Sequence, residues 1–152
     1  LDIGGGTGQI AQLLRPGSAG VVVADVSLPM LRLASQKAGL EAVLGPSEGL
    51  PFADQTFERI IMVDALHHVF DQKATARELW RVLRPGGRLV IQEPDIRRWA
   101  VKMIAVGEKL LLMRSHILSL EKMAVLFEDL PGRVQSHSSG YFAWVIVEKT
   151  LG

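Results

Sequence analysis

The sequence predicts an α/β fold in which helices cover both faces of a mostly parallel sheet. Strand-like and helix-like segments alternate along the chain, and no internal repeat or low-complexity linker interrupts them. The run Val21-Val22-Val23-Ala24-Asp25 is continuously apolar up to its last residue, as expected of a strand buried on both faces. Parallel strands need right-handed crossovers, and their carboxyl ends then meet at one edge of the sheet, where ligands bind.

The elements can be assigned in order from their punctuation. A first strand ends in a glycine-rich loop, and residues 9–14 form a short helix stopped by Arg15-Pro16-Gly17. After strand 21–25, an amphipathic helix runs from Ser27, its N-cap, to Ala38 and ends at Gly39, with Pro29 in its first turn. The later expected elements are strands 41–44, 57–63 and 88–93, helix 73–83, a helix from Ser119 to about Asp129, and strands 134–138 and 141–148.

The glycine loop Asp2-Ile3-Gly4-Gly5-Gly6-Thr7-Gly8 is the most informative segment. Its glycines allow a sharp turn and a close approach of a ligand to the backbone. Gly-rich loops also bind phosphates and dinucleotides, but Asp2 would repel a pyrophosphate and attract a cation. Gln9 also stands where the dinucleotide fingerprint needs its third glycine. We therefore expect a positively charged nucleoside.

Asp25 closes the second strand about 20 residues beyond the loop, where a carboxylate can accept both hydroxyls of an adenosine ribose. The alternative is that Asp25 merely caps the following helix. Ser27 is the better N-cap, which favours the ribose role.

These residues resemble the class I S-adenosylmethionine (SAM)-dependent methyltransferases, most of all the small-molecule subgroup that includes the quinone-ring C-methyltransferases. The resemblance runs in order across about two thirds of the chain. It implies a three-layer Rossmann-like sheet whose last two strands, separated by Ser139-Gly140, form an antiparallel hairpin edge. The matching motifs are Asp2 to Gly8, Asp25, Leu50-Pro51-Phe52-Ala53-Asp54-Gln55-Thr56-Phe57, Asp64-Ala65-Leu66-His67-His68-Val69 and Leu83-Arg84-Pro85-Gly86-Gly87-Arg88-Leu89-Val90-Ile91.

The resemblance also implies which residues bind SAM, and S-adenosylhomocysteine (SAH) after transfer. The family commonly has an acid after the third strand that accepts a hydrogen bond from the adenine amino group, and this chain has Pro46 there. Proline offers no side-chain acceptor, so Ser47 or Glu48 would have to compensate. The expected cofactor-binding residues are Asp2, Gly4, Gly5, Gly6, Gly8, Asp25, Val26, Pro46, Ser47, Glu48, Asp64 and Ala65.

The segment from Asp95 to Arg114 is where substrates are usually chosen in this subgroup. Its apolar residues follow helical spacing, which fits either a helix packed on the sheet or a helix that lines a pocket for an aromatic or isoprenoid methyl acceptor. Arg97 and Arg98 could meet a carboxylate or lie in solvent. The apolar positions are Trp99, Met103, Val106, Leu110 and Met113.

Methyl transfer from a sulfonium demands orientation and a dry site rather than a catalytic triad or a metal. For a hydroxyl or acidic-carbon acceptor a general base would help, and His67 or His68 is the candidate; we name His67 as the catalytic residue. The alternative is that these histidines hold the loop.

Composition limits the function classes. The 152 residues predict a single domain, and 17 basic against 16 acidic residues give no reason to expect nucleic acid. The absence of cysteine excludes disulfides and thiolate metal sites, and no metal is expected. No transmembrane segment or signal peptide is apparent, so a cytoplasmic protein is expected.

The family normally places helices ahead of the glycine loop, whereas this chain opens on its first strand. We therefore expect covering helices to be missing and a homo-oligomer to be possible. Two alternatives to a methyltransferase stay open. One is a non-catalytic SAM-binding or interaction module, suggested by Pro46 and by the missing covering helices, and the other is a nicotinamide-dependent oxidoreductase, which Asp2 and Gln9 disfavour.

Overall fold

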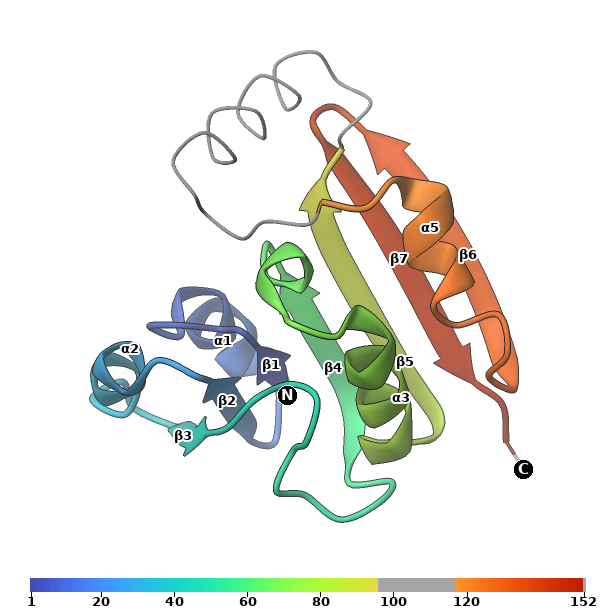
Figure 1. Cartoon of the computed structure of the whole chain (residues 1–152). Coiled ribbons are helices and arrows are strands. Elements are labelled where there is room, and N and C mark those ends of the chain that lie inside the picture. Colours follow the sequence, from blue (N-terminus) through green and yellow to red (C-terminus); the bar gives the residue numbers. More distant parts are fainter. Residues whose placement is uncertain (96–116, 152) are drawn as a thin grey trace.

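The protein is built around one seven-stranded sheet of order β3-β2-β1-β4-β5-β7-β6 (Figure 1). The structure, a computed structural model, describes residues 1–95 and 117–151. Neighbouring strands from β3 to β5 pair in parallel. Their bounds are β1 Asp2–Ile3, β2 Val21–Asp25, β3 Leu40–Leu44, β4 Phe57–Val63 and β5 Leu83–Pro94.

Helices lie on both faces of this sheet, which confirms the predicted three-layer arrangement. Val23 packs with α1 (Gln9–Leu14) and α2 (Leu28–Ala34), whereas the next residue, Ala24, belongs to the larger core that includes α3 (Gln72–Val82) and α5 (Leu120–Val125). Neighbouring side chains of a strand point to opposite faces, so the two helix pairs cover opposite sides. The short 3₁₀ helices are η1 Arg15–Gly17 and η2 Leu66–His68.

The predicted antiparallel hairpin is present at the sheet edge. β6 (Gly132–Ser139) and β7 (Phe142–Lys149) pair antiparallel, and β7 also pairs antiparallel with β5. Gly140, in the turn between them, has φ +60°. Such a turn favours glycine because a Cβ is strained in the left-handed region.

Several element ends differ from the sequence prediction. α2 ends at Ala34 rather than Ala38, and α5 ends at Val125 rather than near Asp129. β5 begins at Leu83 rather than Arg88, because Leu83 already pairs with Phe57 before a register shift. Amphipathic spacing can continue past the end of a helix when the turns that follow still bury apolar side chains. Phe127, which follows α5 and is fully buried, is an example.

The substrate-selecting helix expected over 95–114 falls, apart from Asp95, outside the described residues, as do Arg97 and Arg98. Within the described ranges, no helix is long and apolar enough to cross a membrane.

Candidate cofactor site

The carboxyl ends of β1, β2, β3 and β4 surround a cavity of about 550 Å³. This volume lies in the usual range for small-molecule sites. The position agrees with the rule that parallel sheets bind ligands beyond the carboxyl ends of their strands. The cavity is lined by Ile3, Gly4, Gly6, Ala24, Asp25, Val26, Ser27, Met30, Gly45, Pro46, Ser47, Glu48, Leu50, Met62, Asp64, Ala65, His68, Val69 and Phe70.

Gly4 and Gly6 form the part of the glycine loop that faces the cavity. Both have positive φ, +67° at Gly4 and +54° at Gly6. A Cβ on Gly4 would lie 2.4 Å from the Cβ of Ala65, and one on Gly6 would lie 3.3 Å from Met30 Sδ. The two glycines therefore keep the backbone turn and the space above it open.

Gly5 and Gly8, also predicted to bind cofactor, do not line the cavity. A Cβ on Gly5 would lie 2.6 Å from the Asp2 carboxyl, and one on Gly8 would lie 2.9 Å from Leu40 Cδ1. Gly8 has φ +71° and is the N-cap of α1. These glycines allow the loop to pack closely on the sheet and on α2, so they support the site from behind.

Asp2 is not among the residues that line the cavity either, and its contact with a cationic ligand stays a prediction. Its side chain is 2% exposed and lies behind Gly5, near Ala11 of α1, and its Oδ2 has no hydrogen-bond partner among the described residues. Burial raises the pKa of the Asp2 carboxyl to about 6, against the opposing effects of the chain's amino group and of Ala11. Asp2 lies on the face of β1 that α1 covers, so its carboxyl lies between Gly5 of the loop and Ala11 of α1 rather than in the cavity.

Asp25 sits at the end of β2 and lines the cavity, as predicted. Its Oδ2 accepts from Gly6 N at 2.9 Å and its Oδ1 accepts from Ser27 N at 2.8 Å. The capping alternative is therefore partly right, because Asp25 does bind the backbone at the start of α2, whereas the Ser27 side chain makes no cap bond. Each carboxylate oxygen has two lone pairs, so acceptor capacity remains on both oxygens for a ligand.

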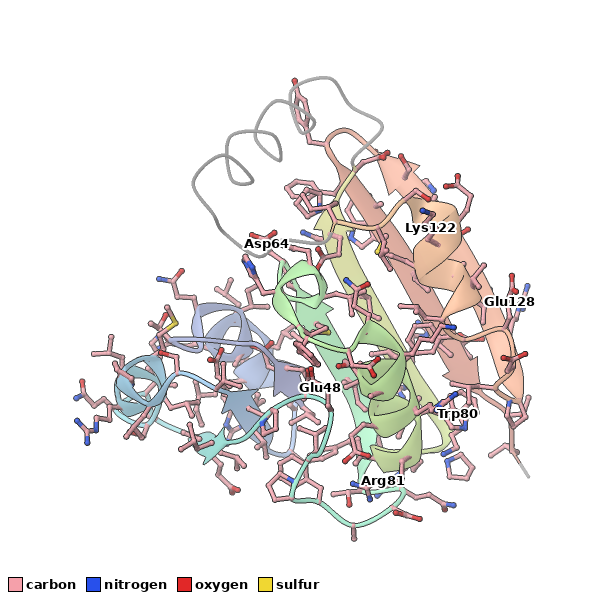
Figure 2. The ribbon with its side chains drawn as sticks, in the orientation of Figure 1. Glu48, Asp64, Trp80, Arg81, Lys122 and Glu128 are labelled. Carbon is pink, nitrogen blue, oxygen red and sulfur yellow. The ribbon has the colours of Figure 1, made fainter. Side chains whose placement is uncertain are left out.

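The loop after β3 brings Pro46, Ser47 and Glu48 to the cavity wall. Ser47 is buried and its hydroxyl lies 3.0 Å from Thr75 Oγ1. Glu48 Oε1 accepts from Phe70 N and Asp71 N at 3.0 and 3.1 Å, which ties this loop to the chain leading into α3 (Figure 2). Its Oε2 takes a longer bond, 3.3 Å, from Ser47 Oγ.

The loop after β4 forms the opposite wall. Asp64 stands at the end of β4 (Figure 2) with a side chain 68% exposed and φ +53°, a conformation uncommon outside glycine. Val26, Asp64 and Ala65 line the cavity as predicted, together with His68 and Phe70.

The predicted catalytic residue His67 is turned away from the cavity. It is 4% exposed, and its Nδ1 lies 2.5 Å from Oε2 of Glu93, a buried residue of β5. The neighbouring His68, whose ring lies 3.9 Å from the His67 ring, lines the cavity instead. Sequence could not separate adjacent histidines in a 3₁₀ turn, because the orientation depends on Glu93.

Asp64, His67 and Glu93 place one ligand-type atom each within 4.8 Å of one another. The arrangement has the residue types of a metal site. However, Glu93 Oε1 already accepts from Ala65 N and Leu66 N, at 3.0 and 2.7 Å. A hydrogen-bonded unit accounts for these contacts, and we assign no metal to it.

Together, the cavity, the glycine loop and the reversed strand β7 define the architecture of the class I methyltransferases. The chain matches the methyltransferase domain family over residues 1–91, and it belongs to this family. S-adenosylmethionine is the cofactor that the family implies.

Similar proteins include quinone-pathway enzymes. The ubiquinone/menaquinone biosynthesis C-methyltransferase UbiE of Pasteurella multocida is 38% identical over 104 residues, which are 61% of this chain and 38% of that protein. The enzyme of the same name from Geotalea daltonii is 35% identical over 111 residues, 66% of this chain and 47% of that protein. The chain thus spans less than half of the length of these curated relatives.

Solved structures agree on the fold. A SAM-dependent methyltransferase of Thermotoga maritima has a TM-score of 0.85 at 21% identity, covering 98% of this chain and 80% of that one. A Haloferax volcanii methyltransferase, solved with the Trm112 activator, has a TM-score of 0.87 at 17% identity, covering 99% and 81%. The [4+2]-cyclase SpnF has a TM-score of 0.79 at 17% identity, covering 99% and 75%, so this fold also carries other chemistry.

Proposed function

We propose that this chain binds SAM in the cavity and transfers its methyl group to a small-molecule acceptor. The observation that carries the proposal is the meeting of Gly4, Gly6 and Asp25 at one cavity, within a chain of the methyltransferase domain family. Because Gly6 has no side chain, a ligand in the cavity can approach the loop backbone closely. The remaining acceptor capacity of Asp25 fits a ribose diol.

Other lining residues would hold the rest of the nucleoside. Pro46 offers an apolar surface for adenine, and Glu48 Oε2 is a carboxylate oxygen with capacity for the adenine amino group, which supports the predicted compensation for the missing acid. Asp64 and Ala65, from the loop after β4, also line the cavity and would bind the amino-acid end of the cofactor.

SAM supplies an electrophilic methyl group on a good leaving group. The chain's own residues then orient the acceptor and exclude water, which can contribute several kcal/mol to lowering the barrier. Apolar side chains such as Met62 and Val69 provide the dry surroundings. We infer that His68 takes the acceptor's proton where the acceptor is a hydroxyl or an acidic carbon.

The acceptor class follows from the relatives. Their name specifies carbon methylation in ubiquinone and menaquinone biosynthesis. We propose that this chain methylates a carbon or oxygen of an aromatic or lipid-like metabolite, which fits the mainly apolar lining of the cavity. A single-domain organisation, homo-oligomerisation and a cytoplasmic location stay predictions from the sequence.

Neither alternative function is favoured. A nicotinamide-dependent oxidoreductase would need a pyrophosphate-binding helix start, but Gly8 packs against Leu40 behind the loop. Pro46 is one ground for a non-catalytic SAM-binding module, and Glu48 stands beside that position on the same wall.

The test is methyl transfer from radiolabelled SAM to a panel of quinols, phenols and hydroxylated lipids. The proposal expects a labelled organic product with one or more of these acceptors, and His68→Ala should reduce its formation by roughly 10²-fold or more if His68 is the base. Cofactor binding without turnover across the panel would instead favour the non-catalytic module.

A further inference from the structure

The loop that follows β4 is held by a buried carboxylate on the neighbouring strand. Glu93 lies near the carboxyl end of β5 and is 1% exposed. One of its oxygens accepts from two successive backbone N–H groups, those of Ala65 and Leu66, and the other faces His67 Nδ1. One side chain thus fixes three consecutive residues.

The position of Glu93 is otherwise an apolar one. Leu89 and Ile91, which precede it on the same face of β5, are completely buried in the main core. An apolar residue would pack there without the cost of desolvating a charge. The contacts with two backbone N–H groups and with the imidazole offset the cost of desolvating Glu93, so we infer that the carboxylate stabilises the loop rather than the core.

Glu93 also determines the proton position on His67. One Glu93 oxygen accepts from two backbone N–H groups and the other lies against His67 Nδ1, so we assign the ring proton to Nδ1, which then donates to Glu93. This orients the His67 ring, against which His68 lies with a centroid distance of 3.9 Å and an interplanar angle of 48°. His68 and Ala65 both line the cavity.

We propose that Glu93 is a positioning residue for the reaction: through Ala65 N and the His67 ring it holds the cavity wall and His68 in register with the acceptor. This inference rests on the proposed function. Glu93 itself touches neither cofactor nor acceptor, so its effect should fall on turnover more than on cofactor affinity.

Glu93→Gln tests this with little change in volume. The glutamine carbonyl can still accept from the loop, but its amide N–H₂ group cannot accept from His67 Nδ1, so the native contact is lost or its direction reverses with a change of His67 tautomer. We expect kcat to fall about 10–100-fold, in line with small misplacements of reacting groups, while the Kd for SAH changes less than about 3-fold. Glu58→Gln is the control, since Glu58 pairs with Arg84 at the surface and is expected to leave both constants unchanged.

A nitrogen-15 NMR spectrum of the His67 ring gives a readout that loss of stability would not move. The native chain should show a proton on Nδ1, and Glu93→Gln should shift that signal. An unprotonated Nδ1 in the native chain would overturn the inference even if the variant fails to fold.

The outcomes also separate this inference from the proposed function. A native chain that is active, with Glu93→Gln retaining its kcat, overturns the role of Glu93 alone. A native chain that transfers no methyl group to any acceptor overturns both.

Discussion

Asp25 shows how one carboxylate can serve the loop and a ligand together. It holds Gly6 N and Ser27 N and still faces the cavity, so its removal should affect binding through direct contacts and through the loop. Sequence reasoning offered ribose binding and capping as alternatives. The geometry makes them compatible.

Asp25→Ala should therefore weaken SAM binding by roughly 1.5–3 kcal/mol, or about 10–150-fold, the range for hydrogen bonds to a charged group. Asp54→Ala is the matched control, because Asp54 is exposed and pairs with Arg81 at 2.6 Å. Calorimetry on both variants makes the comparison. Equal affinities would remove the ribose assignment.

Gly6 lines the cavity, as Gly4 does, but a Cβ on Gly6 would meet Met30 Sδ at 3.3 Å rather than clash with Ala65 at 2.4 Å. Gly6→Ala should lower SAH affinity at least about 10-fold, since the new Cβ enters the cavity and the positive φ adds about 1–2 kcal/mol of strain. Gly20→Ala, with nothing within 4 Å of its Cβ, should bind normally. Native-like binding by a folded Gly6→Ala chain would mean that the loop is a turn and no more.

Asp2 gives the fold a pH dependence. Its folded pKa of about 6 exceeds the ordinary value of 3.8, so the folded state holds the proton more tightly than the unfolded state. The stability that this proton provides is complete below pH 3.8 and is lost as the pH rises to about 6.

Asp2→Asn cannot titrate. As the pH rises through this window, the free energy of unfolding of Asp2→Asn should increase relative to that of the native chain. Above pH 6 it should be higher by on the order of 1–3 kcal/mol. Urea unfolding at several pH values measures the difference. A gap that does not change with pH would contradict the assignment.

At the scale of elements, the sequence predicted the strands well because their signal is local. Strands 21–25 and 57–63 occur with the predicted bounds, since β-branched residues gather in both segments and turn residues flank them. Helix ends were less predictable. Ser27 stands at the N-cap position of α2 as expected, but its side chain makes no cap bond, and its own N–H donates to Asp25 Oδ1.

The starts of α3 and α2 differ in whether a side chain caps the helix, and the effect of this difference on stability can be measured. Asp71 caps α3 by accepting from Ala74 N at 2.9 Å, whereas Ser27 makes no such bond before α2. Asp71→Ala should lower the free energy of unfolding by about 1 kcal/mol. Ser27→Ala should cost less than about 0.5 kcal/mol, as for an ordinary surface change. A larger loss from Ser27→Ala in denaturant titrations would refute this account of the caps.

At the scale of the whole molecule, the site could be located from sequence because parallel strands bring their carboxyl ends together. Val26, Glu48 and Asp64 are far apart in sequence yet line one cavity, as predicted. The directions in which individual side chains point could not be predicted from the sequence in the same way. Asp2 and His67 turn away because of partners on other elements, Ala11 and Glu93.

Glu93 itself was missed. It ends a strand-like run, and the signal that could have indicated it is a carboxylate at a position where the alternation Leu89, Ile91 predicts an apolar residue. Met30, which faces Gly6, carried no chemical signal beyond its place in an amphipathic helix.

The central claim is that the cavity is a SAM site, and calorimetric titration tests it most directly. Native chain should be titrated with SAM, SAH and NADH in parallel, with Asp25→Ala as the binding-deficient comparison. The account predicts one molecule of SAM or SAH bound per chain, weakened in Asp25→Ala, and no heat of binding with NADH. Saturable binding of NADH without any binding of SAM or SAH would contradict it.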